Sequence, residues 1–131
     1  MGYPHPKEVL RMETPKIFES EYRFCLLLWD NEPINSTKLV QLAKESLGWS
    51  KATTYTVIRR LAERGVVKNE NTIVTTLISK EEAQNSRLEE MVEETFEGSM
   101  PAFIAAFSRS KKLTRQEVEQ LKALIDSYEE E

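Results

Sequence analysis

Two helical patterns separated by only two residues constrain the fold of this chain more than any other feature. Apolar side chains recur at helical spacing on both sides of the link Gly48-Trp49. The first pattern begins at Asn35 or Ser36 and the second begins at Ser50, and both residue types cap helices well. Two helices joined by so short a link are typical of a helix-turn-helix.

The helix expected after the link has a regular inward face. Ser50 is a good N-cap, and Gly65 suits the left-handed position that follows a helix. The inward positions follow the i, i+3, i+4, i+7 spacing of an amphipathic helix: Thr54, Val57, Ile58 and Leu61. The helix before the link, closed by Gly48, has its own stripe: Leu39, Leu42, Ala43 and Leu47. We expect the two stripes to share one core.

The flanking segments complete the order of a winged helix. A first helix is expected from Ser20, as its cap, to about Asn31. Its apolar face comprises Phe24, Cys25, Leu28 and Trp29. The β-branched runs Val66–Lys68 and Thr72–Ile78 flank Asn69-Glu70-Asn71, which predicts a hairpin with its turn at these three residues.

The rest of the chain is helical in pattern. Ser79 with Glu82 and Thr114 with Glu117 have the spacing of capping boxes. Apolar stripes follow at helical spacing: Leu88, Met91, Val92, Phe96, Phe103, Ile104, Phe107, Val118, Leu121, Leu124, Ile125 and, last, Tyr128. No other sizeable core exists in this tail to cover them, so the same tail of a second chain is the expected partner, and all but Tyr128 are assigned to a dimer interface.

Charge is distributed unevenly along the chain. The net charge is −4, but Ser50 to Lys68 carries five basic residues against Glu63 alone. A phosphate backbone responds to the local field within roughly 8–10 Å, so an acidic tail does not prevent binding to nucleic acid.

The outer face of the 50–65 helix is the predicted DNA contact. Small and hydroxyl side chains near its N-terminus suit base edges and thymine methyl groups, and the two arginines suit guanine or phosphate. Lys51 and Lys68 suit phosphate contact, which positions without specifying. The predicted DNA-binding residues are Lys51, Ala52, Thr53, Tyr55, Thr56, Arg59, Arg60 and Lys68.

The chain is therefore expected to be mainly α-helical with a small β-hairpin. Residues 1–14 are assigned to a flexible leader, 15–79 to a winged-helix DNA-binding domain and 80–131 to a helical dimerisation domain. Trp29, Trp49 and Cys25 are expected in the core.

Other chemistries lack the residues that they need. His5 is isolated, no Cys/His cluster has metal-ligand spacing, and no glycine-rich phosphate loop is present, so no metal or cofactor is expected. The glutamate pairs of the tail fall on a polar helix face, and no nucleophile–base set exists, so the chain is not expected to be an enzyme. No apolar run reaches the roughly 18 residues of a membrane span, and a single cysteine favours the cytoplasm.

Three segments resemble the penicillinase and methicillin-resistance repressors, a family that includes copper-responsive members. They are Ile17–Trp29 (IFESEYRFCLLLW), Gly48–Gly65 (GWSKATTYTVIRRLAERG) and Gly98–Leu121 (GSMPAFIAAFSRSKKLTRQEVEQL). The resemblance covers about residues 15–128. It implies a winged-helix homodimer that binds a palindromic operator in double-stranded DNA and blocks transcription, and a protease that inactivates it by cutting the tail.

The chain departs from the family pattern at several points. The family's scissile Asn-Phe step aligns with Ala106-Phe107, and the C-terminal cysteine cluster of the copper-responsive members is absent. A basic residue common in the family is replaced by Ala52, and the wing is shorter. These differences argue against copper sensing by that route and for weaker wing contacts.

Two alternative functions follow from the same sequence. A winged helix also serves as a protein-interaction module, because a fold does not determine a function. A regulator with a small-molecule pocket at the dimer core is the third hypothesis, although the apolar tail shows no convergent set of polar residues.

Overall fold

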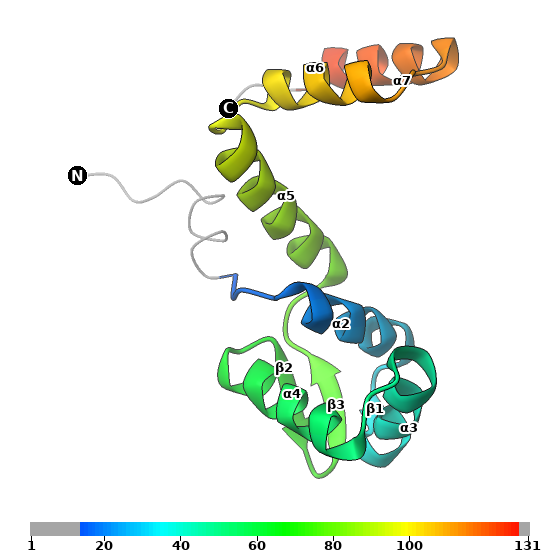
Figure 1. Cartoon of the computed structure of the whole chain (residues 1–131), viewed down its shortest axis with the longest axis vertical. Coiled ribbons are helices and arrows are strands. Elements are labelled where there is room, and N and C mark those ends of the chain that lie inside the picture. The colour runs from blue at the N-terminus through cyan, green and yellow to red at the C-terminus, as the bar shows by residue number, and fades with distance from the viewer. Residues whose placement is uncertain (1–13, 129–131) are drawn as a thin grey trace, which may run out of the picture. The chain divides into compact units, whose positions relative to one another are not determined.

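A computed structural model describes residues 14–128, which divide into two compact units after Leu88. Labelled as in Figure 1, the elements in chain order are α2 (Glu19–Asn31), β1 (Ile34–Asn35), α3 (Ser36–Leu47), α4 (Lys51–Glu63), β2 (Val67–Glu70), β3 (Ile73–Thr76), α5 (Lys80–Phe96), α6 (Met100–Ser110) and α7 (Arg115–Asp126). The predicted class, mainly helical with a small winged-helix β element, is confirmed. The predicted leader, apart from Thr14, and His5 lie outside the described residues.

The two helices of the helix-turn-helix begin and end where their caps predict. The Asn35 side chain accepts a hydrogen bond from the Thr37 amide at 2.8 Å, and Ser50 Oγ accepts one from the Thr53 amide at 3.1 Å. Gly48 closes α3 with φ +71°, a backbone conformation that other residues rarely adopt. The short link follows directly, so α4 starts three residues after Gly48.

The start of α2 differs from the prediction. The helix begins at Glu19 with Phe18 in the N-cap position, so Ser20 is not the cap. The Phe18 amide instead donates to Glu21 Oε1 at 2.9 Å. Because this carboxylate satisfies an amide at the helix start, the helix begins two residues earlier than a Ser20 cap would place it.

The sheet contains three antiparallel strands in the order β1-β3-β2, one more than the predicted hairpin. The third strand, β1, pairs Ile34 with Val74 and has only two residues, too few to show alternation in the sequence. The turn also lies elsewhere than predicted. Asn69 and Glu70 extend β2, and the two turn residues are Asn71 and Thr72, with φ values of 52° and 66°.

A two-residue turn with positive φ at both positions matches the twist of a hairpin, which explains why it replaces the expected three-residue turn. A β-branched residue is strained there, and two contacts hold Thr72 in place. The Ser36 amide donates to the Thr72 carbonyl at 2.8 Å, and Asn35 Nδ2 donates to Thr72 Oγ1 at 3.3 Å. The turn of the hairpin is thus attached to the start of α3.

The first unit has one hydrophobic core, to which three helices and the sheet contribute. Its largest fully buried side chains come from α2, α3, α4 and the sheet: Phe24, Leu28, Leu39, Leu61, Val66, Val67 and Val74. Trp49 stacks on Phe24 with 5.5 Å between ring centroids, and Trp29 Nε1 donates to the Ile78 carbonyl at 3.1 Å. Both tryptophans and Cys25 therefore pack with the core, as predicted.

The helix α5 runs across the division between the two units. Ser79 and Glu82 form the predicted capping box at its start, and Ala83 is buried in the core of the first unit. In the second unit, the rings of Phe96, Phe103 and Phe107 contact one another in sequence. The second predicted capping box, at Thr114, begins α7.

We expect Leu61→Ala to lower the free energy of unfolding by about 2–5 kcal/mol, because it opens a cavity at a fully buried position. Urea denaturation followed by circular dichroism measures this loss. Leu77→Ala is the matched control, since Leu77 is 54% exposed and its truncation should cost less than about 1 kcal/mol. Equal losses in the two variants would contradict the assigned core.

Candidate nucleic-acid interface

The helix α4 presents one face to the core and the opposite face to solvent. It packs between α3 and β2 (Figure 1), and Thr54, Ile58 and Leu61 are buried along its inner side. Thr54 is the one polar residue among them, and its Oγ1 donates to the Ser50 carbonyl at 3.0 Å. The buried face thus has no unsatisfied hydroxyl, and the exposed part of the helix circumference is available to a ligand.

Most of the predicted DNA-binding residues of α4 lie on the available face. Lys51, Ala52, Thr53, Arg59 and Arg60 are exposed, and Thr56 is half-buried. The first three form the first turn, where small side chains allow close approach to base edges. Ser50 Oγ also donates to Thr53 Oγ1 at 3.0 Å, which fixes the orientation of that hydroxyl at the tip of the helix.

Tyr55 lies at the edge of this face rather than on it. Its hydroxyl donates to Ser36 Oγ at 3.2 Å, and its ring packs partly against the core. Tyr55 follows buried Thr54 by about 100° of helix rotation, which turns it toward α3. It therefore bridges α4 and the start of α3, and its ring is half-buried.

The basic residues of the 50–68 segment separate into two groups. Lys51, Arg59 and Arg60 form no ion pair with any residue in the described range 14–128. Lys68 Nζ, in contrast, lies 3.7 Å from Glu70 Oε2 on the same strand. A carboxylate beside a cation lowers its attraction for phosphate, so weak wing contacts stay a prediction for Lys68.

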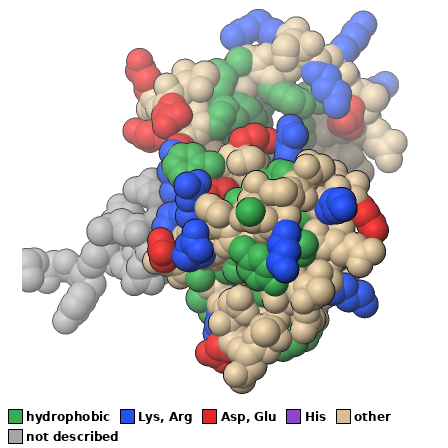
Figure 2. Space-filling model, turned by 60° about the horizontal axis from the view of Figure 1, so that its bottom comes forward, with side chains coloured by type: hydrophobic (Ala, Val, Ile, Leu, Met, Phe, Trp, Pro, Cys, Tyr) green, Lys and Arg blue, Asp and Glu red, His purple; other side chains and the backbone are tan. Residues whose placement is uncertain are grey.

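Arg64 does not belong with the unpaired cations of α4, because it has a partner on α2. Its guanidinium pairs with buried Glu21 of α2, donates to the Lys16 carbonyl at 2.8 Å, and lies 5.3 Å from the centroid of the Phe18 ring. By sequence alone Arg64 counts among the five basic residues of Ser50–Lys68, because helical position does not show which cation has a buried partner. Figure 2 shows basic side chains spread over the central part of the visible face, where acidic ones are few.

The chemistry of the other polar groups is limited. Among residues 14–128 no three His, Cys, Asp or Glu side chains are grouped in a way that holds a metal ion. Burial raises the pKa of the Cys25 thiol to about 12, with a further increase from the nearby Glu21 carboxylate, so this thiol stays protonated. In the described part of the chain no helix combines the length and the apolar character needed to span a membrane.

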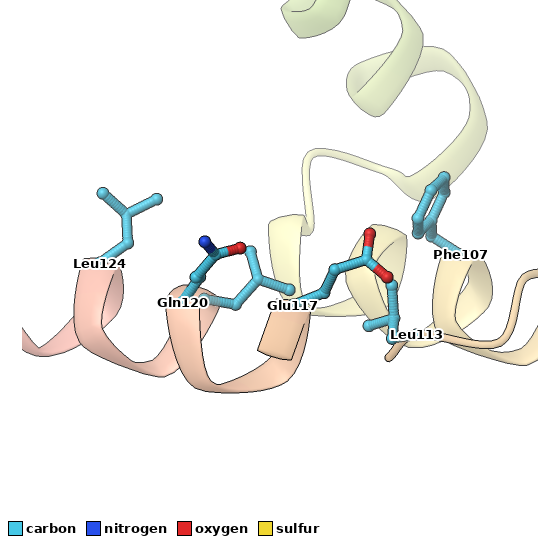
Figure 3. A pocket seen from close by; sticks show the side chains of 6 residues that line it. Phe107, Leu113, Glu117, Gln120 and Leu124 are labelled. Carbon is cyan, nitrogen blue, oxygen red and sulfur yellow. The ribbon is translucent and has the colours of Figure 1, made fainter. Parts of the chain in front are cut away.

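The second unit contains an open cavity of about 310 Å³ between α6 and α7 (Figure 3). Phe107, Leu113, Leu121 and Leu124 provide its apolar lining, and Glu117 and Gln120 provide the polar groups. The Thr114 amide and hydroxyl bond to Glu117 and hold the pKa of that carboxyl below its usual value. Glu117 is therefore charged at neutral pH, and its carboxylate is already engaged by the helix cap.

We expect Arg64→Ala to destabilise the protein by about 2–3 kcal/mol, because it leaves the buried Glu21 carboxylate without its cation. The expected loss is below that of a fully buried pair because the Arg64 side chain is 28% exposed. Urea denaturation at pH 7 measures it. Arg60→Ala, on the exposed side of the same helix, should change stability by less than about 0.5 kcal/mol. A similar effect of both substitutions would contradict the division of the basic residues.

Comparison with known proteins agrees with this architecture. Residues 17–127 match the family described as penicillinase repressor. A penicillinase repressor of Bacillus licheniformis is 17% identical over 120 residues, which cover 88% of this chain and 94% of that protein. The match includes both the winged helix and the tail. Members of this family are transcriptional regulators and not enzymes. The chain thus belongs to the penicillinase repressor family and is a DNA-binding transcriptional repressor.

Proposed function

We propose that the protein acts as a homodimer on a palindromic operator and inserts α4 of each protomer into the major groove. The observation that supports this most directly is the exposed face of α4. It combines Ala52 and Thr53 at the tip with Lys51, Arg59 and Arg60, which have no ion-pair partner among the described residues. Small groups at the tip suit base edges, and free cations beside them suit phosphates.

The second unit supports the homodimer. No side chain of α6 or α7 is buried within one chain, although both helices are amphipathic. Of the predicted interface residues, Val92 is buried, whereas Met91, Phe96, Phe103, Val118 and Leu121 are half-buried and Leu88, Ile104, Phe107, Leu124 and Ile125 are exposed. The exposure reaches 67% for Leu124 and 68% for Ile125. A second copy of the same surface would cover these side chains symmetrically.

We expect the protein to act in the cytoplasm, because it would bind its operator there. The family resemblance adds a protease as a candidate partner. The Ala106-Phe107 step lies within α6, where Ala106 is half-buried and Phe107 is exposed. Proteases cut extended chain segments, so cleavage at this step requires α6 to unwind. Release by cleavage there is therefore tied to the stability of α6.

We expect Arg59→Ala and Arg60→Ala each to weaken the operator complex and to reduce the slope of log affinity against log salt by about one. Fluorescence anisotropy with labelled DNA from upstream of the protein's own gene, over a series of KCl concentrations, measures both quantities. Arg23→Ala is the control, because Arg23 is an exposed cation on α2. Affinity and slope that stay unchanged in both α4 variants would refute the proposed face, and the protein-interaction alternative would then be favoured.

Leu124→Asp should convert the dimer to a monomer at micromolar concentration and reduce operator affinity by about tenfold or more, because two linked half-sites no longer bind together. Sedimentation velocity measures the first effect and anisotropy the second. Lys122→Ala, an exposed change on the same helix, serves as the control. A wild-type protein that sediments as a monomer at this concentration would exclude the two-half-site mechanism.

A further inference from the structure

Arg87, in the second turn of α5, is held by two side chains of α2. Its guanidinium forms an ion pair with the Glu19 carboxylate and lies over the Tyr22 ring, 4.0 Å from the ring centroid. A planar guanidinium bonds to a carboxylate through its edge and stacks on an aromatic ring through its face, so both contacts fit one orientation. The orientation of the Arg87 guanidinium is therefore fixed, and its charge is paired with Glu19.

Two further contacts attach the same stretch of chain to the first unit. The Ile78 carbonyl, just before α5, accepts a hydrogen bond from Trp29 Nε1, and Ala83 is 1% exposed in the core. Trp29 in turn contacts the Tyr22 ring edge-on, with 5.8 Å between the centroids. The chain between residues 78 and 87 is thus attached to the domain at three successive positions, and Arg87 is the last of them.

The helix α5 offers no flexible point beyond this attachment. It is continuous from Lys80 to Phe96, and it contains neither glycine nor proline. Within α5, a change of direction against the winged helix is therefore expected where the helix leaves the first unit. Besides the Arg87 contacts, the hydrogen bond to the Ile78 carbonyl and the burial of Ala83 oppose such a rotation.

We propose that Arg87 is a positioning residue that determines which half-site spacing the dimer accepts. This inference rests on the proposed function, a homodimer joined through its tails on a two-half-site operator. Each base pair added between half-sites displaces one of them by about 3.4 Å and rotates it by roughly 35°. A firmly held α5 resists this displacement, so affinity depends steeply on spacing. A loosened α5 tolerates it.

The test compares operators whose half-site spacing is changed by one or two base pairs in either direction, together with a duplex carrying a single half-site. Fluorescence anisotropy with each duplex is measured for the wild-type dimer, Arg87→Ala, Arg87→Lys and Arg23→Ala. Arg23 is the matched control, because it also pairs with Glu19, at 3.9 Å, but belongs to α2 and does not reach α5. Sedimentation velocity confirms that each variant is dimeric.

We expect the wild-type affinity to fall by about tenfold or more at an altered spacing, because the second half-site is then lost to the dimer. In Arg87→Ala the difference between spacings should shrink to about threefold, with single half-site binding unchanged. Arg87→Lys keeps the charge but not the edge-and-face fit, so it should be intermediate, and Arg23→Ala should match the wild type.

A spacing profile of Arg87→Ala identical to that of the wild type overturns the inference. So does an equal loss of affinity on all duplexes, which indicates damage to the winged helix itself. Glu19→Gln removes the contact from the other side and should also flatten the profile if Arg87→Ala folds poorly. Wild-type protein that binds none of the duplexes refutes the proposed function instead, so the two failures are distinguishable.

Discussion

Burial of one side of α4 is the interaction on which the rest of the structure depends. Leu61 and Ile58 attach this helix to a core that also contains Phe24 of α2 and Leu39 of α3. Because a helix that buries one face must expose the other, this packing also selects the residues that can meet DNA. The hairpin supports the same arrangement, since its turn is bonded to the start of α3.

The number of basic residues in a segment does not show how many of them can bind a phosphate, because some are already paired with carboxylates. Five basic residues lie in the 50–68 segment, yet Arg64 serves a buried carboxylate and Lys68 is balanced by Glu70. The remaining cations lie on α4 and are exposed. The acidic tail contributes the negative net charge, whereas Lys51, Arg59 and Arg60 form no ion pair within residues 14–128. Exposed cations on α4 and a Lys68 paired with Glu70 on the hairpin are therefore compatible in one repressor.

The tail differs from the winged helix, because α6 and α7 bury no side chain within one chain. Ring contacts and helix caps organise α6 and α7, but apolar side chains such as Leu124 remain exposed. A surface of this kind gains free energy when a partner removes it from water. The segment from Ile78 to Arg87, in contrast, is attached to the winged helix by apolar, hydrogen-bonded and charged contacts. The chain thus combines a tail with exposed apolar side chains and an α5 whose first two turns are attached to the winged helix.

The sequence by itself determined the helices, the caps of α3, α4, α5 and α7, the winged-helix order and the outer face of α4, because periodicity and capping act over a few neighbouring residues. It misplaced the cap of α2, where Phe18 and not Ser20 precedes the helix. It did not reveal β1, which is too short for a pattern, or the two-residue turn at Asn71-Thr72. Only the tertiary structure decided that Arg64 pairs with Glu21, that Tyr55 bridges α4 and α3 and that Arg87 holds α2. Arg64 and Glu21 are 43 residues apart, and Arg87 and Glu19 are 68 apart. Contacts over such separations depend on how the elements pack, so local patterns cannot show which charged side chains are already engaged.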